Sequence, residues 1–166
     1  YDDRLFFSGT AGFSYSNSDD AWSAAAQYLY NGDGYADADR EARISEARDN
    51  EADIKLALAV MGQPASAYTR FLQGLIYNSG RHYAAASLTK SELFTDDLSV
   101  GLFAFANLSD LSGFVTPSVS YELFDKASLE LSATFVFGSG DSEYIVLNEG
   151  AALTLGFKAS LGSGTF

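Results

Sequence analysis

The sequence contains no cysteine, only two prolines and a single histidine. The lack of cysteine excludes a disulfide framework and thiolate metal sites, although it leaves the cellular compartment open. No apolar run approaches the roughly 18–20 residues that a transmembrane helix needs. The formal net charge is −12, whereas nucleic-acid binding requires basic patches. We therefore expect neither a helical membrane span nor a nucleic-acid partner.

Apolar residues are nevertheless abundant, at 47% of the chain, and they are finely interleaved with Ser, Thr, Gly and Asn. This composition is typical of strands that have one apolar and one polar face. The 166 residues are an ordinary length for one domain, so we treat 1–166 as a single unit. Because the chain begins at Tyr1 with no basic and apolar leader, we expect that an export signal was removed or not included.

Strict alternation of apolar and polar residues is the dominant pattern, and it predicts seven strands. Each is about 10–12 residues long, which is the length that a tilted strand needs to cross a bilayer. The face assignment of the third is open, because Ala and Ser occupy both of its faces. The predicted strands are Arg4–Ser16, Ala21–Asn31, Arg81–Leu93, Leu98–Leu108, Gly113–Leu123, Ser128–Gly138 and Gly150–Leu161.

The long insert between the second and third strands, Gly32–Gly80, differs in kind from the strands. Asp33–Asp53 is densely charged with both signs, which favours a solvated helix with ion pairs over a calcium site. Pro64 then precedes a predicted helix over Ala65–Ile76. Ala52–Met61 alternates like a strand, but its Ala and Leu content favours a second helix.

The lengths of the connections distinguish a membrane barrel from a soluble β-sandwich. Sandwich strands usually have about five or six residues, and these are about twice as long. Short links (Asn17–Asp20, Phe94–Asp97, Phe124–Ala127) alternate with long ones (Gly32–Gly80, Ser139–Glu149), and only Ser109–Ser112 is short where a long link is expected. Outer-membrane barrels have tight periplasmic turns and larger extracellular loops. Because lipid cannot satisfy backbone polar groups, a spanning sheet must close on itself.

The predicted fold class is therefore all-β: a transmembrane antiparallel up-and-down β-barrel with a long helix-containing extracellular loop at 32–80. Aromatic residues near strand ends, such as Tyr15, Trp22 and Tyr121, are typical of interfacial girdles. Seven is an odd number, whereas single-chain bacterial barrels usually have an even number of strands. We expect a segment of a larger barrel, and the alternative is an eight-stranded barrel with one further strand.

The final strand Ala151–Leu161, the terminal Phe166 and the segments Asn107–Asp110 and Gly138–Tyr144 resemble the carboxy-terminal region of Gram-negative, porin-like outer-membrane proteins. This resemblance implies a multi-pass protein of the bacterial outer membrane, in contact with outer-membrane lipid and lipopolysaccharide. It also implies that the barrel-assembly machinery recognises the terminal aromatic residue. The sequence leaves open whether copies of the barrel form a homo-oligomer.

Five charged residues are the candidate pore-lining residues: Glu122, Glu130, Lys158, Lys90 and Glu92. Rings of charge in a pore bias ion selectivity, so these residues would filter small solutes. The alternative is a network of salt bridges that only fills a narrow barrel. Four apolar residues at helical spacing in the insert form a candidate constriction of the pore, or else cap its mouth or contact a partner: Tyr68, Phe71, Leu72 and Leu75.

Catalysis is the least supported class of function. His82 and Ser87 are five residues apart on one predicted strand and so point to opposite faces. We expect no enzyme activity, no cofactor and no metal site. The primary hypothesis is a porin-like channel for passive passage of small solutes. The second is a structural or adhesive barrel whose loop at 32–80 binds a partner.

Overall fold

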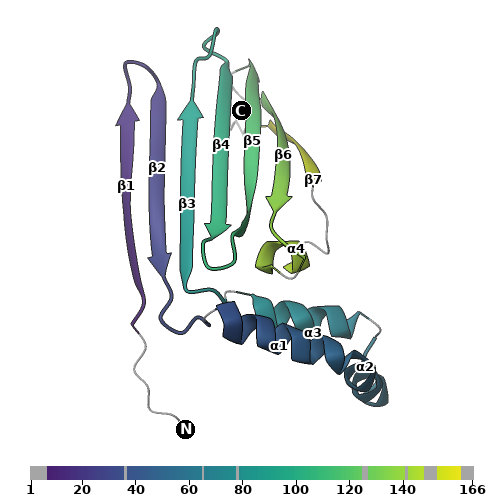
Figure 1. Cartoon of the computed structure of the whole chain (residues 1–166). Coiled ribbons are helices and arrows are strands. Elements are labelled where there is room, and N and C mark those ends of the chain that lie inside the picture. Colours follow the sequence, from purple (N-terminus) through teal and green to yellow (C-terminus); the bar gives the residue numbers. More distant parts are fainter. Residues whose placement is uncertain are drawn as a thin grey trace.

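The computed structural model describes residues 7–35, 37–64, 66–77, 79–124, 127–140, 142–147 and 153–161. The described strands form one antiparallel up-and-down sheet in sequence order, β1 to β7, and not two stacked sheets (Figure 1). The predicted antiparallel β architecture is therefore confirmed at this level. The strands are β1 Gly9–Asn17, β2 Trp22–Tyr30, β3 His82–Lys90, β4 Leu98–Asn107, β5 Ser112–Phe124, β6 Ala127–Phe137 and β7 Leu153–Leu161.

All seven predicted strands are present, with ends that shift by a few residues. The predicted beginnings of the first strand at 4–6 and of the last at 150–152 lie outside the described residues, as does Phe166. The sheet is open: within the described residues, β1 and β7 each pair on one side only. Figure 1 shows these two strands at opposite sides of the sheet.

The register gives the sheet one apolar and one polar face, because directly paired residues share a face. On the apolar face, Leu88 pairs with Leu102, and Val119 pairs with Leu131. On the polar face, the hydroxyl oxygens of Thr116 and Thr134 lie 2.9 Å apart. The alternation in the sequence thus becomes a separation of chemistry between the two sides of one layer.

Three helices form in the insert: α1 Asp37–Asp49, α2 Glu51–Val60 and α3 Ala67–Ile76. The helix predicted over Ala52–Met61 is confirmed, and Glu51 and Asp53 in its first turn favour it by complementing the helix dipole. A fourth short helix, α4 Glu143–Leu147, follows β6 and was not predicted. All four helices lie at the same end of the sheet (Figure 1). We call α1, α2 and α3 the helical cap.

The buried core lies at this end of the molecule. Ile44 and Ala47 of α1 and Tyr68 and Ile76 of α3 are all buried, and the Tyr68 hydroxyl donates to the Ala47 carbonyl oxygen at 3.1 Å. Burial raises the pKa of Tyr68. In the part of the chain that the structure describes, each helix is too short or too polar to cross a membrane.

Candidate functional site

The polar face brings together three of the five predicted pore-lining residues. Glu130 on β6 pairs directly with Lys158 on β7, and Glu122 on β5 pairs with Ser128 on β6. Because paired residues share a face, Glu122, Glu130 and Lys158 lie on the same side of neighbouring strands, towards the β5–β6 turn. They form a charged strip at the end of the sheet opposite the helices.

The three charged residues of the strip do not form salt bridges with one another. Among the described residues, none of Glu122, Glu130 and Lys158 forms an ion pair. Glu122 and Lys158 are exposed, and Glu130 is half-buried. Their neighbours across the face are small: Ser120 beside Glu130, and Ser160 beside Ser128. Glu122 and Lys158 are therefore accessible to solvent.

Lys90 lies on the apolar face, contrary to the prediction. It pairs with Trp22 and with Val100, which are both residues of that face. Lys90 is the last residue of β3, so its Nζ reaches the end of the sheet, where it donates to the carbonyl oxygen of Asp20 at 2.5 Å. The same Nζ lies 5.9 Å from the centre of the Trp22 ring. The apolar stem can thus stay on the apolar face while the charge reaches water. Glu92 lies beyond β3, in the β3–β4 connection.

The apolar face is uncovered over its whole width. Phe13 on β1 is 66% exposed, Leu131 on β6 is 61% exposed and Phe157 on β7 is 71% exposed, so the exposed residues extend from one edge of the sheet to the other. In the described part of the chain, no element packs over this face. A soluble monomer rarely exposes a contiguous apolar patch of more than a few hundred Å². The face therefore requires either a nonpolar environment or a partner.

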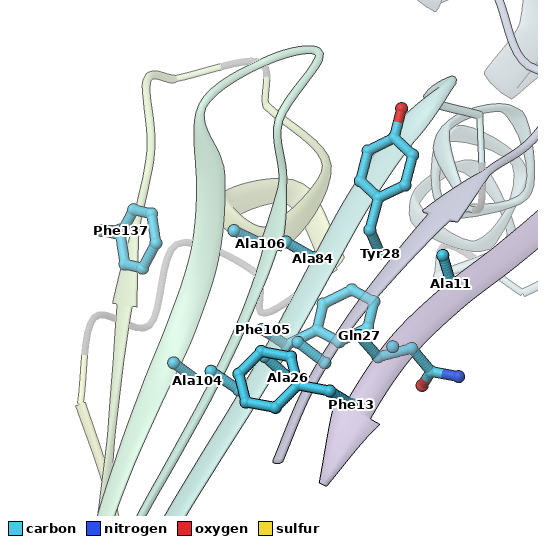
Figure 2. A pocket seen from close by; sticks show the side chains of 13 residues that line it. Ala11, Phe13, Ala26, Gln27, Tyr28, Ala84, Ala104, Phe105, Ala106 and Phe137 are labelled. Carbon is cyan, nitrogen blue, oxygen red and sulfur yellow. The ribbon is translucent and has the colours of Figure 1, made fainter. Parts of the chain in front are cut away.

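A shallow trough of about 560 Å³ crosses this face where β2, β3 and β4 carry alanines. Figure 2 shows Ala26, Ala84 and Ala104 at its floor, with Phe13 and Phe137 among the side chains around it. The trough arises because small residues occupy adjacent positions on three neighbouring strands. Its lining is mostly apolar, and Gln27 and Tyr28 are the polar residues that the described chain contributes to it.

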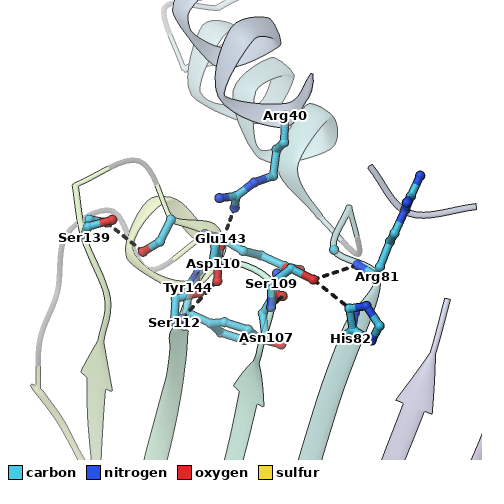
Figure 3. Close-up of polar contacts among 12 residues, drawn as sticks. Arg40, Arg81, His82, Asn107, Ser109, Asp110, Ser112, Ser139, Glu143 and Tyr144 are labelled. Atoms are coloured by element: carbon cyan, nitrogen blue, oxygen red, sulfur yellow. Dashed lines mark hydrogen bonds and ion pairs between the residues drawn. The ribbon is translucent and has the colours of Figure 1, made fainter. Parts of the chain in front are cut away.

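A buried polar cluster joins the helical cap to the end of the sheet (Figure 3). Asp110, in the β4–β5 turn, forms an ion pair with Arg40 of α1, and both side chains are almost fully buried. The same carboxylate accepts the Ser112 hydroxyl at 2.7 Å and the backbone N–H of Glu143 at 2.8 Å. One turn residue thus holds α1, β5 and α4 together.

The second carboxylate of the cluster belongs to Glu143, which is 2% exposed. It accepts hydrogen bonds from the Tyr83 hydroxyl at 2.9 Å and from Asn107 Nδ2 at 2.8 Å. The Tyr83 hydroxyl in turn accepts the backbone N–H of Gly80 at 2.8 Å. Tyr83 and Asn107 are polar-face residues of β3 and β4 that pair with each other. Glu143 therefore anchors α4 to the polar face.

Tyr144 places α4 over that face. Its ring centroid lies 5.7 Å from that of Phe105 and 5.5 Å from that of Phe114. These two phenylalanines pair across β4 and β5, two residues in from the strand ends. Burial, and then the nearby Glu143 carboxylate, raise the pKa of Tyr144. The short helix thus covers part of the polar face, within the length of the strands.

The predicted constriction residues lie in the helical cap. Tyr68 is buried against α1, and Phe71 and Leu75 line a hollow of about 270 Å³ with residues of α1 and α2. Leu72 is half-buried on the same helix. The segment that reaches the polar face is α4 and not α3. Sequence reasoning missed α4 because a five-residue helix carries too little periodicity to be recognised.

His82 and Ser87 lie on opposite faces of the sheet, as predicted. His82 lies on the apolar face, where its Nδ1 is 2.6 Å from the Tyr28 hydroxyl, whereas Ser87 lies on the polar face. Within the described ranges, no three His, Asp or Glu side chains gather in a way that could hold a metal ion.

Comparison with known proteins adds no relative: no protein-family model matches the chain, and neither a curated protein nor a solved structure gives a significant match.

Proposed function

We propose that the sheet is part of the wall of an outer-membrane β-barrel that lets small solutes pass. The observation that carries this proposal is the uncovered apolar face, opposite a face of hydroxyls and charges. Lipid would cover the first face, and water would wet the second. Strands of 9 to 13 residues have the length that a tilted transmembrane strand needs.

The arrangement of the connections supports the same proposal. The links β1–β2, β3–β4 and β5–β6 lie at one end, and the helical cap and α4 lie at the other (Figure 1). In this proposal the short links face the periplasm and the helices face the outside. Outer-membrane lipid and lipopolysaccharide would then be the surroundings of the apolar face.

Glu130 and Lys158 would set the ion selectivity of the channel, because they lie on the polar face and form no ion pair with another described residue. The α4 helix would narrow the opposite mouth by covering the polar face beside Phe105 and Phe114. Solutes would therefore pass a narrowed opening at one end and a charged strip at the other.

Planar-bilayer recordings test this proposal. Glu130→Lys replaces a negative with a positive charge on the proposed lumen wall, so the reversal potential in a salt gradient should shift towards anion preference. Glu41→Lys, on the exposed surface of α1, makes the same change of charge away from the strip and is the matched control. A protein that forms no conducting channels, or equal reversal potentials for both variants and the parent, would contradict the proposal.

A second function is favoured by the outer surface of α2. This helix has no buried residue, and Leu56, Val60 and Met61 are 65%, 80% and 68% exposed. Such residues could bind a protein partner outside the cell, which would make the barrel an adhesive or structural one. In that case Leu56→Ser with Val60→Ser would abolish partner binding and leave the conductance unchanged.

A further inference from the structure

The two edges of the sheet are built for pairing. The described parts of β1 and β7 contain no proline, and neither the β1–β2 nor the β6–β7 register contains a bulge. Lys158 is the single charged residue on either strand, and it points to the polar face. Natural proteins blunt exposed edges with prolines, bulges, charges or covering segments. Within the described residues, β1 carries none of these devices and β7 carries only Lys158, so further strands are expected beside both edges.

The directions of the strands restrict what can pair there. Six successive antiparallel pairings connect β1 to β7, so these two strands run in the same direction. Direct contact between them would be parallel. A second copy with its helices on the same side of the membrane would also offer a parallel edge. An odd number of intervening strands keeps every pairing antiparallel.

The width of the lumen restricts the number of these strands. The interior of an eight-stranded barrel is just wide enough for its own side chains, whereas a helix with side chains is about 10–12 Å across. Tyr144 nevertheless packs on Phe105 and Phe114, inside the line of the strand ends. An interior filled by its own side chains would leave no room for a helix at this depth, which favours more than eight strands.

We propose that an odd number of further strands, at least three, joins β7 to β1. This inference rests on the proposed membrane function. Each would run antiparallel to its neighbours and continue both the apolar and the polar face. The closed wall would then contain ten or more strands around a water-filled lumen that accommodates α4. The polar face has room for water at mid-height, where Gly101, Ser118 and Ser132 are neighbours.

Cysteine labelling of the complete protein in lipid vesicles tests the width of the proposed lumen. Ser118→Cys would present a thiol to the middle of the polar face. Val119→Cys, the next residue on β5, would present one to the apolar face. Each variant is treated with a small methanethiosulfonate and with a bulky maleimide, and Ser18→Cys in the exposed β1–β2 turn gives the reference rates. We expect Ser118→Cys to react with both reagents within about tenfold of the reference, and Val119→Cys to react with neither.

The outcomes separate the two proposals. If Val119→Cys is protected but Ser118→Cys rejects the bulky reagent, the membrane wall stands and the wide barrel is overturned. If Val119→Cys reacts as fast as the reference, the apolar face lies in water and the membrane function fails as well. End-on electron-microscopy averages in lipid discs give an independent answer, because barrel diameter grows with strand number. A closed ring of eight strands would overturn the proposal whatever the labelling rates.

Discussion

The helical end and the middle of the sheet satisfy their side chains in opposite ways. At the helical end, the side chains of Asp110 and Glu143 are buried and hydrogen-bonded, and apolar residues such as Ile44 and Ile76 are covered. Along the strands, residues as apolar as Leu131 and Phe157 are more than half exposed. The first region is complete within the described chain, whereas the second needs an environment that the described residues do not supply. A contrast of this kind is expected where a protein passes from water into lipid.

The largest expected loss of stability comes from disrupting the buried ion pair at the helical end. Arg40→Met removes the partner of Asp110 and leaves a buried carboxylate uncompensated, which costs about 3–5 kcal/mol. Denaturant unfolding in lipid vesicles measures this loss. Lys55→Met is the control, because it breaks the exposed pair with Glu51 and should cost at most about 1 kcal/mol. Equal losses for the two variants would mean that the Arg40–Asp110 pair is not buried in solution.

A somewhat smaller loss of stability is expected from a charge placed on the apolar face. Leu131→Arg places a charge on the apolar face near the middle of β6. If this face contacts lipid, as proposed, the variant should lose about 2–4 kcal/mol of stability in a bilayer. Ser132→Arg places the same charge on the polar face, beside the small residues Ser118 and Gly156, and should cost far less. The free energy of unfolding of both variants in lipid vesicles decides the question. In a water-soluble sheet, Leu131→Arg would change stability by only about 0.5 kcal/mol.

The smallest expected loss of stability comes from removing one tyrosine hydroxyl in each of the two regions. Tyr83→Phe removes the donor to Glu143 and the acceptor of the Gly80 N–H, so it should cost about 1–3 kcal/mol. Tyr28→Phe removes an exposed hydroxyl that contacts His82, and its cost should be about 0.5 kcal/mol or less. Thermal unfolding followed by circular dichroism ranks the two variants. A reversed order would place the strongest polar contacts in the strands and not at the helical end.

Most of the sheet could be predicted from the sequence, because period-two alternation determines which residues share a face. The exception is β3, where Ala84, Ala85, Ala86 and Ser87 give no apolar–polar contrast. The pairing of Trp22 with Lys90 fixes the phase of that strand, and this pairing is visible only in three dimensions. The prediction for Lys90 failed for this reason.

The buried cluster could not be predicted, because its members are far apart in the chain. Asp110 and Arg40 are separated by 70 residues, and Glu143 and Tyr83 by 60. In the sequence, Arg40 is one charge within a densely charged stretch. In the sequence, the segments Asn107–Asp110 and Gly138–Tyr144 stand out only for their resemblance to porin-like proteins, yet both contribute to this cluster.

The conformations of the turns are also hard to predict from the sequence. Ala21 and Leu111 end the β1–β2 and β4–β5 turns with positive φ values of 50° and 56°, a conformation in which glycine is the usual residue. Neither position carries glycine, so the sequence gives no sign of this conformation. It indicates the turns only as polar gaps between alternating segments, which leaves the exact ends of the turns undetermined.

The shortness of the β4–β5 turn has a consequence for insertions. Connections between strands usually accept added residues at little cost. Here the turn carries Asp110, which binds α1, β5 and α4 at once, so an added residue would displace that carboxylate from three partners. An epitope tag should therefore be tolerated in the β1–β2 turn but not between Leu108 and Leu111. Variation in length at the helical end would then be confined to the insert and to the segment around α4.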